Sequence, residues 1–279
     1  MLRFQLSAIV FLVTAISLSA QSEGQPPPYQ WFMLGVTGRI SSKWSVAFSR
    51  QYSRLGEQGA LFDYYLDDFK LRRRFGDHWE VSAGLSYLVS NPDSEEPTTK
   101  RRYSFGLRWQ TRLLGDLRFY HRLIAERHLQ ERRYDGRIIG TMGLEYAGLD
   151  LFKTINIRPF IVGQLYYFLG GAWIKQYDSK DEFVRKSPTY GLHRARLRLG
   201  LSVSPCSWLQ LSGFYLLQKE FNNRHALLYH HQINEINPAT GKITRPFDNY
   251  RAWGVGLTFL IGSKKKSKQK SEVSASDME

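Results

Sequence analysis

The stretch RRYSFGLRWQTRL, from Arg101 to Leu113, decides the fold class. From Tyr103 onward, alternate positions are mainly aromatic or aliphatic, and the positions between them are basic, polar or glycine. Successive side chains of a β-strand point to opposite faces, so a period of two indicates a strand. The stretch therefore predicts an amphipathic strand with one apolar face and one basic face.

The same alternation recurs along the chain, clearly in His78–Val89 and in His193–Val203. Less regular versions occupy Trp31–Ile40, Lys43–Ser53, Phe62–Phe75, Gly115–Leu129, Arg137–Leu149, Ile157–Leu169, Trp208–Phe221 and Tyr250–Ile261. No segment shows a sustained helical period, so we expect an all-β fold. Most segments reach the roughly 9 to 11 residues with which a tilted strand crosses a bilayer.

Short and long connections alternate between these segments, which is typical of outer-membrane barrels. We expect a closed antiparallel up-and-down transmembrane β-barrel of about 12 strands over residues 31–261, because bacterial barrels have even strand numbers. Twelve requires a strand at Ala226–Glu235. If Trp31–Ile40 runs outward from the periplasm, twelve strands put the short turns outside. Long loops outside require eleven strands or a further strand.

A soluble β-sandwich or a lipocalin-like barrel would also show alternating strands. Parity alone does not say which face lies inside. Strand length, a number of strands above a lipocalin's eight, and aromatic residues near strand ends favour the membrane barrel. Those aromatic residues are Trp44, Trp79, Tyr103, Trp208, Trp253 and Phe259.

The segments outside the barrel have their own signatures. Residues 1–20 hold Arg3, an apolar stretch and small residues before Gln21, which predicts a cleaved secretory signal peptide. Residues 21–30 form a linker, and residues 262–279 form a polar, Lys-rich tail that we expect to be disordered. Beyond residue 20 charged residues interrupt every long apolar window, so no transmembrane helix is expected. A single cysteine, Cys206, excludes a disulfide scaffold.

The last strand of the chain has a regular alternation that ends near an aromatic residue. In NYRAWGVGLTFLI, Trp253, Val255, Leu257, Phe259 and Ile261 share one parity. This resembles the C-terminal strand by which the outer-membrane barrel assembly machinery recognises its clients, where a terminal aromatic is usual. Phe259 would fill that role.

The predicted signal peptide and four stretches after it together resemble the bacterial domain of unknown function 2490. The stretches are WFMLGVTGRISSKWSVAFSRQY near the start, FYHRLIAERHL, HRARLRLGLSVS and the closing GLTFLI. The resemblance covers about Trp31 to Ile261 and rests on the residue composition of the strands and on their order. It implies an outer-membrane β-barrel without an assigned activity, located in the cell outer membrane. It supplies no catalytic residue.

The basic parity suggests a function for the interior. If the apolar parity faces lipid, the lumen receives a set of cations that exceeds the acids Glu80, Glu126 and Glu145. Loop carboxylates such as Asp63 and Asp67, with Asp68, could pair with them for stability alone. Rings of arginine also select anions, which predicts an anion-favouring pore or pocket for small anionic solutes. The cations are Lys70, Arg72, Arg74, Arg102, Arg108, Arg112, Arg118, Arg122, Arg194, Arg196 and Arg198.

An alternative is a lipid-modifying enzyme of the phospholipase or lipid A hydrolase type, which needs a serine and a histidine on the lipid-facing wall. His121 shares the apolar parity with Phe119 and Leu123, but no serine can be matched to it. We therefore predict no catalytic residue, no cofactor and no metal site. The expected partners are outer-membrane lipids and the assembly machinery. Nucleic acid is not expected, because the basic residues alternate within strands and form no exposed patch.

Overall fold

The computed structural model describes residues 28–54, 63–90, 92, 97–129, 134–147, 149–151, 155–170, 174–177, 183–187, 190–223 and 249–262. The predicted signal peptide and nearly all of the Lys-rich tail lie outside the described residues. Every regular element in the described part is a strand. No helix there is long and apolar enough to cross a membrane.

The strands follow the alternating segments of the sequence closely. Most extend over 11 to 17 residues. They are β1 (Tyr29–Arg39), β2 (Trp44–Arg54), β3 (Tyr64–Phe75), β4 (Trp79–Ser90), β5 (Thr98–Leu114), β6 (Leu117–His128), β7 (Gly136–Tyr146), β8 (Leu149–Leu151), β9 (Ile155–Leu169), β10 (Ile174–Tyr177), β11 (Phe183–Ser187), β12 (Gly191–Cys206), β13 (Leu209–Asn223) and β14 (Tyr250–Ile261).

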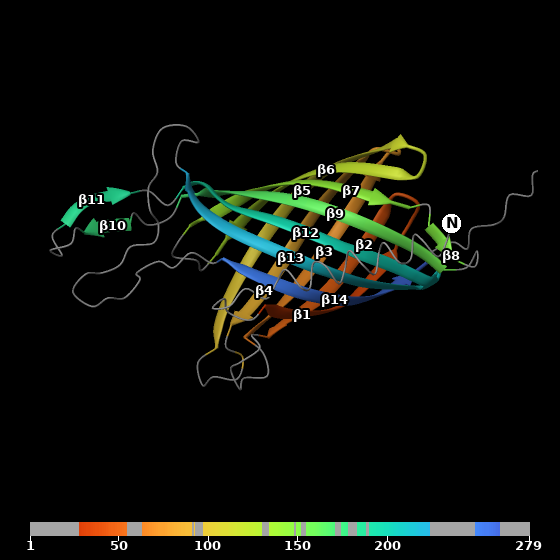
Figure 1. Cartoon of the computed structure of the whole chain (residues 1–279), viewed down its shortest axis with the longest axis horizontal. Coiled ribbons are helices and arrows are strands. Elements are labelled where there is room, and N and C mark those ends of the chain that lie inside the picture. The colour runs from red at the N-terminus through yellow and green to blue at the C-terminus, as the bar shows by residue number, and fades with distance from the viewer. Residues whose placement is uncertain are drawn as a thin grey trace, which may run out of the picture.

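The sheet closes on itself (Figure 1). Its strands follow the order β12-β13-β14-β1-β2-β3-β4-β5-β6-β7-β9, and β12 pairs again with β9. The three-residue β8 adds only a short pairing to the edge of β9. Eleven strands of the described part therefore form the closed barrel, and the all-β barrel prediction is confirmed.

Two details of the prediction are corrected. The strand count is eleven, because β13 pairs directly with β14 and leaves no place between them for a strand at Ala226–Glu235. That segment lies outside the described residues. The barrel is also not purely antiparallel, since β1 and β14 run parallel, with Tyr29 opposite Ala252 and Gly38 opposite Ile261. In a ring of hairpins with an odd number of strands, the first and last strands necessarily point the same way.

Eleven strands also resolve the placement of the connections. Long connections follow β2, β4, β6, β9 and β13, at the end of the barrel where β1 begins. Short connections follow β1, β3, β5 and β12, and β14 finishes at that same end. In Figure 1 the β10–β11 hairpin projects at the long-loop end and β8 lies at the short-turn end. Alternating connection lengths thus separate the two ends of the barrel.

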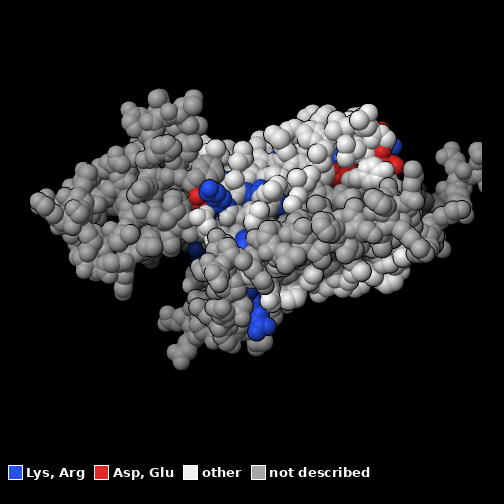
Figure 2. All heavy atoms as spheres, in the orientation of Figure 1, with Lys and Arg blue, Asp and Glu red and all other residues white. Residues whose placement is uncertain are grey.

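The apolar parity faces outward. On β1, Phe32 and Leu34 are exposed whereas Trp31 is buried. Directly opposite residues on neighbouring strands lie on the same face of the sheet. The strand register therefore assigns every residue of the barrel to the outward or the inward face. In Figure 2 a broad uncharged surface covers the region where β6 and β7 lie in Figure 1. The exposed outward residues include Phe48, Phe69, Leu85, Phe105, Leu123, Met142, Ile161, Leu197, Leu211 and Val255.

The interior is packed with side chains. Trp31, Phe214, Leu216 and Ala252 form one buried cluster. A second cluster of Ile139, Tyr166 and Phe168 lies toward the long-loop end.

A glycine makes room for an aromatic ring in the first cluster. A Cβ atom on Gly254 would stand 2.1 Å from Cζ of Phe214, so the ring requires the bare backbone. The inward aromatic rings thereby reduce the bore of the barrel.

Candidate functional site

The predicted lumenal arginines lie on the inward parity. Register places Arg72 opposite Ser82, Arg108 opposite Arg122, and Arg196 opposite Gln164, away from the exposed apolar face. Seven of these arginines are half-buried inside the barrel: Arg72, Arg102, Arg108, Arg122, Arg194, Arg196 and Arg198. Arg74 shares this parity but is exposed near the end of β3. The anion-favouring role of the set stays a prediction. Arg112 and Arg118 share the parity but are exposed near the β5–β6 turn, at the short-turn rim.

Cations toward the long-loop end are paired with carboxylates. Nε of Arg137 lies 2.6 Å from Oε2 of Glu126, and the two side chains are only 10% and 13% exposed. Nε of Arg194 donates to Oε1 of Glu220 at 2.8 Å. Charges removed from water are tolerated when they are paired and hydrogen-bonded. These pairs neutralise much of the basic charge in this half of the barrel.

Tyr166 organises the same half. Its ring lies 5.0 Å from the guanidinium carbon of Arg196 and 5.3 Å from that of Arg137. Nη1 of Arg196 donates to the Tyr166 hydroxyl at 2.9 Å, and that hydroxyl donates to Gln164 at 3.0 Å. A buried phenol that accepts from an arginine and faces two guanidinium groups fixes the position of both.

Aromatic faces take the place of carboxylates for other arginines. Arg108 lies over Tyr120 at 4.4 Å, and Arg198 lies 5.4 Å from the ring of Phe160 and 5.2 Å from that of Phe214. Cation–π attraction is weaker than a buried ion pair and leaves the positive charge in place. These positions therefore retain a positive field.

Arg122 lies deep in the barrel among like charges. Its guanidinium is repelled by Arg72 and Arg108 and attracted by Glu80 and Asp68. Gly106 lies beside it: a Cβ atom there would be in ordinary contact with the Arg122 nitrogens at 3.7 Å, and only 2.5 Å from Oγ of Ser82. A concentration of positive charge thus extends inward from the short-turn half.

Some charged residues were misassigned or missed from sequence. Asp67 and Asp68 lie within β3 and not in a loop. Asp68 points inward and pairs with Lys70, whereas Asp67 points outward and pairs with Arg50 at 2.6 Å.

Arg158 was not predicted as lumenal, yet its Nη1 lies 3.3 Å from Oε1 of Glu145. Arg137 is not predicted either. Both arginines lie in stretches where apolar and polar residues alternate poorly, Arg158 in INIRPF and Arg137 in RIIGTM. Glu126 and Glu145 lie on the predicted inward parity, and an inward carboxylate indicates that a cation lies beside it. The cations are Arg137 beside Glu126 and Arg158 beside Glu145.

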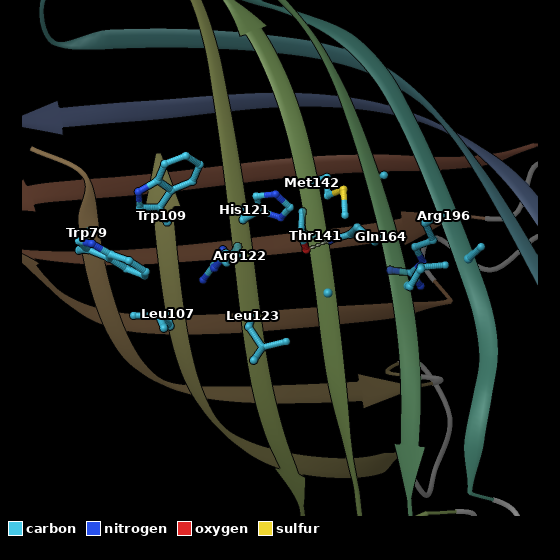
Figure 3. A pocket seen from close by; sticks show the side chains of 14 residues that line it. Trp79, Leu107, Trp109, His121, Arg122, Leu123, Thr141, Met142, Gln164 and Arg196 are labelled. Carbon is cyan, nitrogen blue, oxygen red and sulfur yellow. Dashed lines mark hydrogen bonds between the residues drawn. The ribbon is translucent and has the colours of Figure 1, made fainter. Parts of the chain in front are cut away.

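His121 lies on the outer wall beside an apolar groove of about 760 Å³. Figure 3 shows Trp79, Trp109, His121 and Met142 on successive strands of this wall. Register places Trp109 and Met142 on either side of His121, and its ring contacts Phe119 at 4.7 Å. These neighbours supply neither a nucleophile nor an orienting carboxylate, so the geometry does not favour the lipid-modifying enzyme.

Phe259 lies on the outward parity two residues before the end of β14. Its ring stacks on that of Trp208 with centroids 6.3 Å apart and an interplanar angle of 4°. This places both rings at the short-turn rim of the outer wall. A role of Phe259 in barrel assembly stays a prediction.

Comparison with known proteins adds no family or relative, since neither a family model nor a curated protein matches the chain. The resemblance to the domain of unknown function 2490 stays a prediction. Among the described residues, no group of three or more histidine, cysteine, aspartate or glutamate side chains is placed to hold a metal ion.

Proposed function

We propose that this protein is an outer-membrane β-barrel whose arginine-rich interior favours small anions. The observation that carries the proposal is the division of the strands into an exposed apolar face outside and a basic face inside. A soluble barrel would do the reverse, because exposed contiguous apolar surface on soluble proteins is limited to patches of a few hundred Å².

The borders of the apolar belt support a bilayer of ordinary thickness. On β3 the outward residues Tyr65 and Arg73 are eight residues apart, and on β4 Tyr87 and Trp79 have the same separation. Eight residues span about 26 Å along a strand, or roughly 20 Å of height at a tilt of about 40°. This compares with the apolar band of about 25 Å in outer-membrane barrels.

Arginines at these borders are held on aromatic rings. Arg73 lies 5.1 Å from the ring of Trp44 and 4.7 Å from that of Phe75, near the short turns. Arg101 lies over Tyr87 at 5.7 Å, toward the long loops. Aromatic side chains with cations beside them are expected at the two levels where the hydrocarbon core of a bilayer meets the lipid headgroups.

The interior supports an anion pocket more than an open pore. Inward side chains such as Tyr166, Val162 and Leu216 are at most 3% exposed, so they pack against one another and do not border a water-filled channel. Arginines that face aromatic rings keep their charge, and a surplus of positive charge in a confined lumen attracts anions. A barrel that only provides structure would show no such preference.

Membrane placement can be tested by cysteine labelling in a Cys206→Ser background. Two single-cysteine variants are made: Leu129→Cys, at the long-loop end, and Ser42→Cys, in the β1–β2 turn. With long loops outside, a membrane-impermeant maleimide should label residue 129 on intact cells and residue 42 only after the outer membrane is permeabilised. Recovery of the protein in the soluble fraction, or equal labelling of both sites on intact cells, would overturn the proposal.

A further inference from the structure

We propose that the short-turn mouth of the barrel is a binding site for a phosphate-class oxyanion, an inference that rests on the anion preference proposed above. A cavity of about 220 Å³ opens there between the ends of β1, β3 and β14 and the start of β2 and β4. We call it the vestibule. Its charged lining consists of Arg39, Lys43, Arg72, Arg74 and Glu80.

The vestibule has an excess of positive charge. Four cationic side chains face one carboxylate, Glu80. Within the described residues, no carboxylate lies within 4.0 Å of the side-chain nitrogens of Arg72 or Arg74. Arg137 and Arg194, toward the other end, each have a carboxylate partner. The lining of the vestibule therefore carries positive charge that its single carboxylate does not balance.

Charges behind the vestibule strengthen its field. Arg72 lines the cavity and also repels Arg122, which is repelled by Arg108 as well. Low-dielectric walls with one sign of charge focus the potential at the opening. A multivalent anion in the vestibule would relieve this repulsion, because it would supply the negative charge that the protein lacks there.

Hydroxyl groups complete the donor set. The Ser41 oxygen accepts hydrogen bonds from the backbone nitrogens of Lys43 and Trp44, which fixes the turn and leaves its own proton free to donate. Ser45 and Thr37 also line the cavity. Guanidinium groups with hydroxyl donors match the tetrahedral oxygens of phosphate, which arginine binds in bidentate geometry.

The size of the vestibule limits the ligand. Pockets for drug-sized molecules occupy roughly 300 to 1,000 Å³. The vestibule, at about 220 Å³, is smaller, so inorganic phosphate or the phosphate head of a small ester fits it better than a larger solute.

The test measures phosphate binding to purified full-length protein in a non-ionic detergent by calorimetry. The probes are inorganic phosphate and glycerol phosphate, and chloride serves as the monovalent comparison. We expect saturable binding of at least one phosphate probe that is stronger than that of chloride, and that weakens with added salt because exposed charges are screened. Binding of the ester alone would identify a phosphate monoester as the ligand.

The matched variants use three consecutive arginines. Arg72→Gln and Arg74→Gln remove charge from the vestibule, whereas Arg73→Gln removes the same charge from the outer wall. We expect each of the first two to weaken phosphate binding about tenfold or more, equivalent to at least about 1.4 kcal/mol, and Arg73→Gln to leave it unchanged.

Absence of phosphate binding in the wild-type protein would overturn the inference, as would equal weakening by Arg73→Gln. Heat-dependent electrophoretic mobility shows whether each variant still forms the barrel, and Lys43→Gln provides a second vestibule variant if one fails to fold. Cysteine labelling reports membrane placement separately, so a membrane barrel that binds no phosphate would reject only this inference.

Discussion

The ring of Tyr120 lies against Gly143 on the inner wall, so closely that a Cβ atom on residue 143 would stand 2.3 Å from Cζ of Tyr120. The two residues are direct cross-strand partners on β6 and β7. Tyr120 in turn carries Arg108 on its face. A glycine on one strand thus positions an arginine two strands away.

Gly143→Ala is therefore expected to lower the free energy of unfolding by about 1 to 3 kcal/mol, because the added methyl group forces the Tyr120 ring to move. The measurement is urea-dependent unfolding of the barrel in detergent or lipid. Gly140→Ala is the matched control on the same strand, since nothing lies within 4 Å of its Cβ position. Equal destabilisation by both substitutions would show that ring packing is not the cause.

Glu126→Gln should destabilise the barrel by about 3 kcal/mol or more, because it leaves Arg137 buried without its carboxylate partner. Asp135→Asn removes the partner of Arg127 in an exposed pair with atoms 4.0 Å apart, and should cost about 0 to 1 kcal/mol. The same urea titration compares the two variants. A small effect of Glu126→Gln would mean that water reaches Arg137 in solution.

Tyr166→Phe should lower the free energy of unfolding by about 1 to 3 kcal/mol, because it removes a buried hydrogen-bond partner of Arg196 and Gln164. Tyr103→Phe, on a side chain that is 53% exposed on the outer wall, is expected to change it little. Comparable losses in the two variants would contradict the role assigned to the Tyr166 hydroxyl.

Removing the aromatic packing should open the interior. We expect Trp31→Ala combined with Phe214→Ala to give ionic current in planar bilayers, where the wild-type barrel gives little or none. The reversal potential in a KCl gradient should show preference for chloride, because Arg198 is then uncovered. Leu217→Ala, on the outer parity of β13, should open no path. A cation-selective current in the double variant would refute the proposed anion preference.

Much of the wall could be predicted from sequence because parity is a strong signal. Arg194, Arg196 and Arg198 alternate with Ala195 and Leu197, and the structure places the two sets on opposite faces as expected. The sequence did not settle which face was inside, because a soluble barrel produces the same period. The exposure of residues such as Phe105, at 59%, decides it.

Other features depend on pairing between distant strands, which a local pattern does not contain. Asp67 and Asp68 are adjacent in sequence, yet one pairs with Arg50 outside and the other with Lys70 inside. Trp31 is an apolar residue on the inward, mainly polar parity. It is buried there because its ring packs against Phe214, on a strand far along the chain. The strand count likewise depended on a long connection whose role only the β13–β14 register reveals.

The parallel pairing of β1 with β14 has a consequence for re-engineering the chain. Tyr29 begins at one end of the barrel and Ile261 finishes at the other, although the two strands are neighbours. A tight turn cannot join them. Any circularly permuted version would need a linker that travels the whole height of the cylinder, through its bore or along its oily exterior.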